Sequence, residues 1–596
     1  MRIRIFISLC FVFFALRTFA TPEIKYIVSF EEPRTHYVKV QMEISNWSKQ
    51  ELEVKMPVWT PGSYLVREFS RFVERLKAYD KDNVQLHAEK FSKNGWRINA
   101  GRKNKIYIEY FVYAYELSVR TSFIDEEHAF INGAGVFMFI NNALDLPCTV
   151  EIKPNKAWKS ISTSLDRQNP DNPWIFKVED YDHLIDAPME IGNHYILRFE
   201  AAGIPHEMAL FGQANYDTAQ IKIDVPKIVE EEKKIFGELP CKKYVFIVHN
   251  IPNGSGGLEH MNSTTLQVGR NGYTPGGSYN NFLSLVAHEY FHLWNVKRLR
   301  PKPLGPFNYD QENYTDLLYI AEGFTAYYAS LISRRCNFIT EDGFLSAVAG
   351  FMTTLDNTPG NYIQSLAESG IDAWIKYYRP SENNINATIS YYTKGALIGA
   401  LLDIYLLDAT AGKRGLDEVM KQLYDEFYKN RNKGYTAEDF IKTVEKIAGH
   451  DMNSFFGKYI YRPDTIPYKE FFNKAGLILV DDNLGKSIPY LGANSSFING
   501  KINVTAVERN SPAWRDGINV NDELLAADDV RLTDDLTKFI ATKKANDEIL
   551  FTVSRSGILK TVKVKLVNTP KVSYSFKKSD QLSVKENLIY QRWLNE

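Results

Sequence analysis

The chain has 596 residues, of which 24% are charged, and its formal net charge is −1. This length accommodates about three to four domains, and 44% hydrophobic residues is typical of globular proteins rather than of disordered or fibrous ones. The balanced charge gives no basic field for nucleic acid, and four cysteines are too few for a disulfide scaffold.

The first twenty residues have the pattern of a secretory signal peptide. A short basic start at residues 1–4 precedes a mostly apolar run over residues 5–16, and the small residues Thr18 and Ala20 suit cleavage before Thr21. A bilayer span needs roughly 20 apolar residues, so this run is too short to cross a membrane. We therefore predict an exported protein, secreted or periplasmic, with no stable membrane insertion after cleavage. An uncleaved membrane anchor is the alternative.

The next segment, residues 21–200, is predicted to form an antiparallel β domain. Its runs at residues 37–44 and 105–112 alternate apolar and polar side chains at period two, as strands with one buried face do. Turn clusters at residues 60–63 and 132–135 separate such runs. We expect an antiparallel sandwich or saddle.

Residues 201–475 change to a mainly helical pattern. Strands are predicted at residues 244–249 and 263–268. Helices are predicted at residues 219–236, 279–296, 314–334, 391–407 and 436–448. The last of these opens with an acidic variant of the capping box at Thr436 and ends at Gly449. We expect an α+β domain with most of its helices towards the C-terminus.

The strongest chemical signal is an H-E-x-x-H sequence at residues 288–292. It lies in a helical pattern that must end before Pro301. Residues four apart share one helix face about 5–6 Å apart, so His288 and His292 can bind one Zn²⁺ ion together. Glu289 then flanks the open coordination position, where it can accept a proton from the attacking water. The alternative is a buried aromatic helix whose two histidines are satisfied by hydrogen bonds.

A catalytic zinc ion needs a third protein ligand, and the next predicted helix offers an acid. Glu322 sits in an otherwise apolar and aromatic face, where an isolated carboxylate is costly unless it is paired or bound to metal. Glu312 and Asp316 lie nearer the helix start, where acids are commonplace. We therefore predict one Zn²⁺ ion per chain, held by His288, His292 and Glu322.

Longer segments carry a resemblance to a known family. The string H-E-Y-F-H-L-W-N-V-K-R at residues 288–298 resembles the glycyl aminopeptidases with a C-terminal PDZ domain, which are gluzincin zinc metallopeptidases. The strings W-T-P-G-S-Y at residues 59–64 and R-E-F-S-R at residues 67–71 resemble the N-terminal domain of that family. The resemblance spans about residues 23–570. It implies a thermolysin-like, mostly helical catalytic domain and a preference for small N-terminal residues, Gly and Ala.

The same resemblance implies a site for the substrate N-terminus. The string G-G-L-E-H at residues 256–260 takes the place of the gluzincin exopeptidase motif, so Gly257 and Glu259 are expected to bind the substrate N-terminus, with the Glu259 carboxylate holding the α-ammonium. Leu258 and His260 stand where the alanyl enzymes have Met and Asn. An ordinary solvated loop acid is the alternative for Glu259.

A second implied element is a tyrosine for the oxyanion. Tyr392 matches the tyrosine of a Y-x-K-G motif by its distance from Lys394 and Gly395. A phenol near zinc would stabilise charge that exists only in the tetrahedral transition state. The alternatives are a tyrosine of the core and the adjacent Tyr391.

Residues 484–570 resemble a PDZ domain of the bacterial protease type, through motifs between residues 511 and 525. Such domains bind chain ends or extended peptides by strand addition, and Leu491 and Gly492 are candidates for the carboxylate-binding loop. A purely structural PDZ domain that packs on the catalytic domain is the alternative. The predicted boundaries are 1–20 for the signal peptide, 21–200 for the N-terminal β domain, 201–475 for the catalytic domain, 484–570 for the PDZ domain and 571–596 for a polar tail.

Together these features predict an exported zinc aminopeptidase that acts on peptides. A zinc endopeptidase, or a non-catalytic protein that binds peptides through its PDZ domain, is the alternative. The basic residues Lys297, Arg298 and Arg300 follow the metal helix, where they either match the helix dipole or contact a substrate carboxylate.

Overall fold

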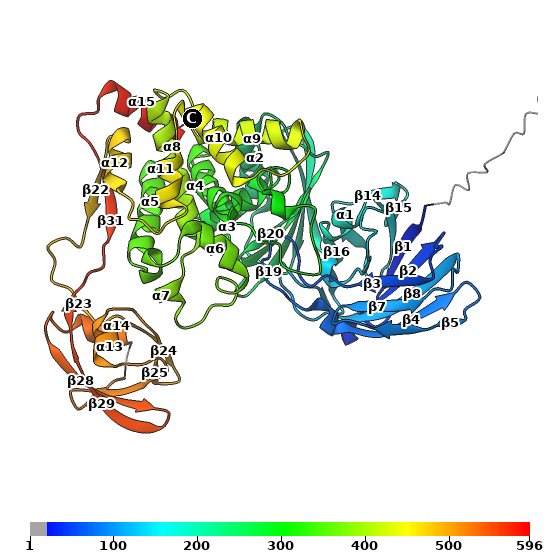
Figure 1. Cartoon of the computed structure of the whole chain (residues 1–596), viewed down its shortest axis with the longest axis horizontal. Helices are drawn as coiled ribbons and strands as arrows, with labels where there is room; N and C mark the ends of the chain where they lie inside the picture. The colour runs from blue at the N-terminus through cyan, green and yellow to red at the C-terminus, as the bar shows by residue number, and fades with distance from the viewer. Residues whose placement is uncertain (1–20, 534, 596) are drawn as a thin grey trace, which may run out of the picture.

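The computed structural model describes residues 21–533 and 535–595. The predicted signal peptide, residues 1–20, lies outside these residues. The described chain forms a β-rich N-terminal domain, a mostly helical middle domain and a small β-rich C-terminal domain, which confirms the predicted fold class (Figure 1). Within residues 21–533 and 535–595, no helix is both long and apolar enough to cross a membrane.

The N-terminal domain is built on an eight-stranded sheet of order β14-β15-β12-β1-β2-β8-β4-β5. At its centre, β2 (Tyr37–Ser45) pairs antiparallel with β8 (Lys105–Tyr113), and every second residue of both strands is buried, as the period-two pattern predicts. Among the described strands of this sheet, β1 (Glu23–Ser29) and β12 (Cys148–Lys153) pair in parallel, whereas the other pairings are antiparallel. The other strands of this sheet are β4 (Val73–Asp80), β5 (Gln85–Leu86), β14 (Asp166–Asn169) and β15 (Asn172–Val178).

The middle domain opens with a five-stranded sheet of order β17-β18-β19-β21-β20. Its strands are β17 (Tyr195–Ala201), β18 (Ile204–Phe211), β19 (Tyr244–Ile251), β20 (Gly257–Glu259) and β21 (Ser263–Gly269). Strands β18, β19 and β21 are parallel to one another, whereas β20 runs antiparallel to β21 at the edge of the sheet. One side of β20 therefore has no strand partner in the described part of the chain.

Helices make up the rest of the middle domain. They include α2 (Thr218–Phe236), α3 (Gly277–Phe291), α4 (Thr325–Arg335), α5 (Glu341–Asp356), α8 (Tyr391–Ala409), α9 (Leu416–Leu423) and α10 (Ala437–Ala448). The predicted capping box of α10 is present, because the Thr436 side chain accepts from the Asp439 amide and the Asp439 carboxylate accepts from the Thr436 amide. Helices α5 and α9 are additional to the predicted set.

Two predicted helices differ from the structure, and both differences lie at the metal motif. The helix predicted over residues 279–296 ends at Phe291, because the chain then turns back on itself, with Val296 at φ +83° and its amide bonded to the Leu299 carbonyl. The helix predicted over residues 314–334 begins only at Tyr319, with a π-helical turn over Tyr319–Phe324 that leads into α4. Such π-turns are frequent at functional sites.

The C-terminal β-rich domain is inserted within the middle domain. Strand β22 (Leu477–Asp481), which precedes it, pairs antiparallel with β31 (Tyr574–Lys578), which follows it (Figure 1). Helix α15 (Val584–Asn595) then buries Trp593 in the core of the middle domain, where its indole N–H donates to the Tyr327 hydroxyl at 2.9 Å. The segment expected as a polar tail therefore contributes a strand and a helix to the middle domain.

A buried acid in α2 gives a testable pH dependence of stability. The Glu232 side chain is fully buried, and neither carboxylate oxygen has a hydrogen-bond partner among the described residues. Burial raises its pKa well above the ordinary 4.5. Folding therefore takes up a proton above pH 4.5, and the native state loses stability as the pH rises towards the folded pKa.

We expect Glu232→Gln to stabilise the protein at neutral pH, because the amide has the same shape and no proton to take up. The gain should be larger at pH 7 than at pH 5, because the proton uptake linked to folding increases as the pH rises above the ordinary pKa of 4.5. Urea denaturation of both proteins at the two pH values measures it. The exposed Glu230→Gln is the control. An equal gain at both pH values would contradict the prediction.

Candidate metal centre

Three side chains predicted as ligands meet at one point between α3 and the π-turn. His288 lies in the last turn of α3, His292 caps that helix, and Glu322 projects from the π-turn. The Nε2 atoms of the histidines are 3.2 Å apart, and they lie 3.6 and 3.4 Å from the Glu322 carboxylate. Two ligands each about 2.1 Å from a tetrahedral ion stand about 3.4 Å apart, so these separations fit one such ion. The two separations between a histidine and the Glu322 carboxylate are longer than ordinary hydrogen bonds.

Asn295 holds the two ligand-bearing segments together. Its carbonyl accepts a hydrogen bond from His292 Nδ1 at 3.0 Å, which turns Nε2 of that ring towards the cluster. Its side-chain amide donates to the carbonyls of Ile320 at 2.8 Å and Ala321 at 3.2 Å, and lies 3.0 Å from the Thr325 hydroxyl. The end of α3 is thereby fixed to the turn that carries Glu322.

The charges at this centre favour a cation. Burial opposes protonation of His292, but the Glu322 and Glu259 carboxylates outweigh it and raise its pKa to about 9. Burial lowers the pKa of His288, whereas His292 and His288 hold the pKa of Glu322 far below its usual range despite burial. The three side chains therefore attract positive charge to the point where their donor atoms meet.

Glu289 lies under the edge strand β20. Its side chain is 4% exposed, and a Cβ built on Gly257 would lie only 2.3 Å from its Oε1 and 2.4 Å from its Cδ. Burial raises its pKa to about 8, with Glu259 and Glu322 adding to the rise and His292 opposing it. Position 257 therefore needs glycine because the Glu289 carboxylate occupies the space that a side chain would fill.

Glu259, at the end of β20, is nearly buried without a partner. Its side chain is 4% exposed, and within the described residues its carboxylate has no hydrogen bond or ion pair. A loop of the N-terminal domain closes over it, since a Cβ on Gly62 would lie 2.7 and 2.8 Å from its two oxygens. The string at residues 59–64, which carries part of the family resemblance, thus reaches the metal centre. Local sequence patterns gave no signal of this contact.

Tyr392 lies beside the cluster at the start of α8. Its ring centroid is 6.2 Å from that of His288, whereas the Tyr391 ring is fully buried and its hydroxyl has no partner in the described part of the chain. Two glycines bring this helix close to the π-turn: a Cβ on Gly323 would lie 2.5 Å from the Gly395 Cα. The structure therefore places Tyr392 next to a predicted metal ligand.

The basic residues after α3 make contacts inside the protein. Lys297 pairs with Asp186 at 2.8 Å, and His260 lies 3.1 Å from the same carboxylate. Arg298 donates to the carbonyls of Leu293, Met261 and Pro240 and to the Asn262 side chain, each at 2.8 Å. The side chains of Lys297 and Arg298 are both buried, and both are paired with groups of the protein itself. For Arg298, the bond to the Leu293 carbonyl agrees with a role at the helix end.

The two candidate residues of the PDZ loop, Leu491 and Gly492, lie just before the first strand of that domain's main sheet. Leu491 is buried in its core, and Gly492 has φ +75° and packs against Ser511. They directly precede β24 (Ala493–Ile498), which forms one edge of the domain's main sheet. A role in peptide binding stays a prediction.

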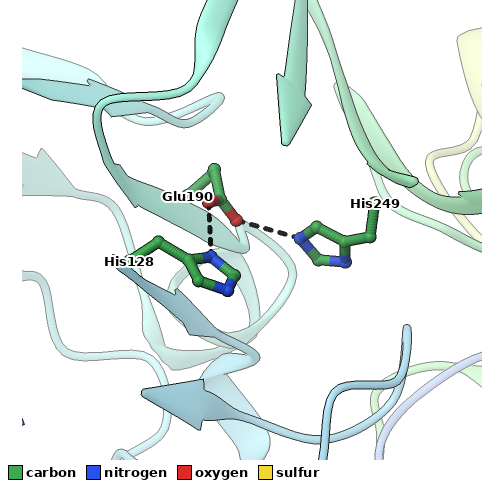
Figure 2. Close-up of side chains that lie close together, drawn as sticks. All are labelled: His128, Glu190 and His249. Atoms are coloured by element: carbon green, nitrogen blue, oxygen red, sulfur yellow. Dashed lines mark hydrogen bonds and ion pairs between the residues drawn. The ribbon is translucent and has the colours of Figure 1, made fainter. Parts of the chain in front are cut away.

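A second cluster of His and Glu lies where the first two domains meet, and no sequence pattern predicted it. Figure 2 shows the Glu190 carboxylate between the rings of His128 and His249, all fully buried. Each carboxylate oxygen contacts a different ring, at 2.8 Å to His128 Nδ1 and 2.9 Å to His249 Nε2. These are hydrogen-bond lengths. The cluster therefore joins β10 (His128–Ile131) and β16 (Met189–Gly192) of the first domain to β19 of the second.

Comparisons with known proteins agree with this architecture. A family model described as the Peptidase M61 N-terminal domain matches residues 25–193, one described as M61 glycyl aminopeptidase matches residues 281–398, and a PDZ domain model matches residues 489–566. The chain is similar to an aminopeptidase N family protein from Idiomarina loihiensis, at 30% identity over 96% of this chain and 100% of that chain, with a TM-score of 0.89.

More distant similarities are weaker. An M1 zinc metallopeptidase from Deinococcus radiodurans is 12% identical, over 75% of this chain and 95% of that chain, with a TM-score of 0.49. Native yeast LTA4 hydrolase is 13% identical, over 75% of this chain and 68% of that chain, with a TM-score of 0.46. Curated protein sequences gave no match.

The matched domains follow one another in the order that the sequence predicts, and the helical one carries the metal-type donor set. The protein is therefore a metallopeptidase. Its similarity along nearly the whole of the Idiomarina loihiensis protein, together with the matched models, allows a closer assignment: the chain belongs to the M61 glycyl aminopeptidase family. The resemblance predicted from the sequence is confirmed.

Proposed function

We propose that the protein is an exported zinc aminopeptidase that removes small residues, Gly or Ala, from the N-termini of peptides. The family description supports the reaction and the small first residue. The Gly62 loop, which lies against Glu259, supports a restricted space for that residue. Export rests on the sequence pattern of residues 1–20 alone.

One Zn²⁺ ion per chain would be held by His288, His292 and Glu322. Two imidazoles and one carboxylate form a donor set typical of catalytic zinc sites, which keep one position open. The side chain of His288 retains 17% exposure, against 1% for His292 and 2% for Glu322, so the centre is open on the His288 side. When bound there, Zn²⁺ supplies Lewis acidity for the scissile carbonyl and the attacking water.

Side chains of the protein would transfer the proton and stabilise the charge that develops during the reaction. Glu289 accepts the proton of the attacking water and passes it to the leaving amine. The Tyr392 ring lies beside that of His288, and its hydroxyl would donate a hydrogen bond to the oxyanion of the tetrahedral transition state. The free side of β20 would hold the substrate as an added strand.

The unpaired carboxylate of Glu259 is the observation that carries the aminopeptidase assignment. A nearly buried carboxylate is unfavourable without a compensating cation, and the α-ammonium of a peptide is such a cation. The Gly62 loop lies against the same carboxylate at the end of β20, so a longer chain has no path beyond it. An endopeptidase would need that path.

Release of Gly and Ala from free and N-acetylated short peptides tests this function. We expect the zinc-loaded protein to cleave only the free peptides, and a chelator to abolish the cleavage until zinc is restored. Internal cleavage of blocked peptides would establish an endopeptidase. No turnover of either set by protein of verified zinc content would favour a peptide-binding protein, in which β24 offers the free sheet edge.

A further inference from the structure

Two arginines of the N-terminal domain lie near the metal centre without an anionic partner. Arg67 donates to the Ser63 hydroxyl at 2.8 Å, and Ser63 directly follows the glycine that contacts Glu259. The Nε groups of both Arg67 and Arg120 are buried, and neither has a hydrogen-bond acceptor in the described part of the chain. Neither guanidinium forms a salt bridge with any described carboxylate. A guanidinium in this state favours an external anion.

The loop that carries Arg120 is bonded to strand β21 in the five-stranded sheet of the middle domain. The Gln267 side chain donates to the Leu117 carbonyl at 2.9 Å, and the Gln267 amide bonds to the Gly256 carbonyl at 2.9 Å. The Ser118 hydroxyl accepts from the Arg120 amide at 3.2 Å. The loop therefore lies near Gly256, which is the end of β20 opposite to Glu259.

Arg120 acts electrostatically on a side chain that the site carboxylates also affect. Burial raises the pKa of Tyr378 to about 12, Arg120 opposes that rise, and Glu322 and Glu259 add to it. Burial and the neighbouring Arg120 together lower the pKa of Arg67. Arg120 and the site carboxylates thus both act on Tyr378, and Arg120 also acts on Arg67.

The direction of a bound peptide determines what Arg120 would meet. A substrate with its ammonium at Glu259 runs along β20 towards Gly257, where Glu289 lies, and then towards Gly256. The part that leaves after cleavage is therefore on the Arg120 side. Lys297 and Arg298, which also follow the metal helix, are occupied by Asp186 and by backbone carbonyls and are not free for this role.

We propose that Arg120, with Arg67 beside it, binds a carboxylate on the leaving side of the substrate, so that the enzyme prefers di- and tripeptides with a free C-terminus. This inference rests on the proposed aminopeptidase function. A chain-terminal carboxylate and an acidic side chain of the second residue share this chemistry, and a guanidinium binds either in the same bidentate way.

Rates on matched peptides test the proposal. With Ala-Ala and Ala-Ala-Ala against their C-terminal amides, the wild type is expected to lose about 10- to 100-fold in kcat/KM on amidation, since a hydrogen-bonded charge contributes about 1.5–3 kcal/mol. In Arg120→Gln this ratio of acid to amide should fall to near one. Ala-Asp-amide separates the two sources, because a rate restored to that of Ala-Ala means that a side-chain carboxylate also binds.

Several controls keep the outcome interpretable. The highly exposed Arg34→Gln removes the same charge elsewhere and should leave the acid-to-amide ratio unchanged. Arg120→Lys keeps a positive charge and should retain part of the preference if Arg120→Gln fails to fold. Equal wild-type rates on acids and amides, or an unchanged ratio in Arg120→Gln, would overturn the proposal. Absence of turnover on every peptide would instead refute the aminopeptidase function itself.

Discussion

Gly257→Ala is expected to remove nearly all turnover although it adds a single methyl group. The new Cβ would lie 2.3–2.6 Å from the Oε1, Cδ and Cγ atoms of Glu289, so the carboxylate must leave its position. A displaced general base lowers kcat by about 10²- to 10⁴-fold, the same range as Glu289→Gln. Steady-state kinetics on a free Ala peptide measure both variants.

Metal content and stability distinguish this effect from a general loss of structure. None of the three predicted ligands is among the atoms closest to the new methyl group, so Gly257→Ala should bind as much zinc as the wild type and melt at nearly the same temperature. Gly277→Ala is the matched control, since it lies in the same helix as Glu289 and its Cβ would meet nothing within 4 Å. Wild-type kcat in Gly257→Ala would show that Glu289 is not held where it acts.

Glu259→Gln is expected to lower kcat/KM for peptides with a free N-terminus more than for any blocked substrate. The amide keeps the shape but loses the charge that pairs with the substrate ammonium. Breaking a buried charge pair costs several kcal/mol, so kcat/KM for free Ala peptides should fall by about 10²- to 10³-fold. Any residual hydrolysis of N-acetylated peptides should not change, because they carry no ammonium.

The pattern of this loss is the diagnostic measurement. A folding defect would lower the melting temperature and the zinc content along with the rate, whereas loss of ammonium binding lowers only the rate on free peptides. The exposed Glu126→Gln serves as the charge control. Since the Glu259 carboxylate has no described partner, its replacement should not lower the melting temperature. Unchanged kinetics on free peptides would assign the N-terminus to another group.

The cluster of His288, His292 and Glu322 could be predicted from the sequence because each of its members is recognisable from the pattern of a single helical segment. Two histidines four apart on a helix define one face, and an acid on an apolar helix face needs a partner, which selected Glu322 over the acids near the helix start. The structure brings these three side chains together across 29 intervening residues. Each step used only the periodicity of a single segment or the cost of burying a charge.

Contacts between segments far apart in the chain could not be predicted from the periodicity of single segments. The premature end of α3 depends on Asn295, whose amide bonds to carbonyls of the π-turn. The contact of Gly62 with Glu259 joins residues nearly 200 positions apart. Periodicity says which face of a segment is buried but not which other segment covers it. Composition likewise gave no indication that the Glu190 carboxylate lies between His128 and His249.

The position of α15 has a consequence for how the enzyme is made. Trp593 donates to Tyr327 on the helix that continues from Glu322, yet residues 489–566 of the PDZ domain come before it in the chain. During synthesis the ribosome must therefore complete the PDZ domain before the catalytic core can close. A stop codon introduced ahead of residue 489 would remove β31 and α15 as well, so it would expose the active domain's core rather than trim a separate module.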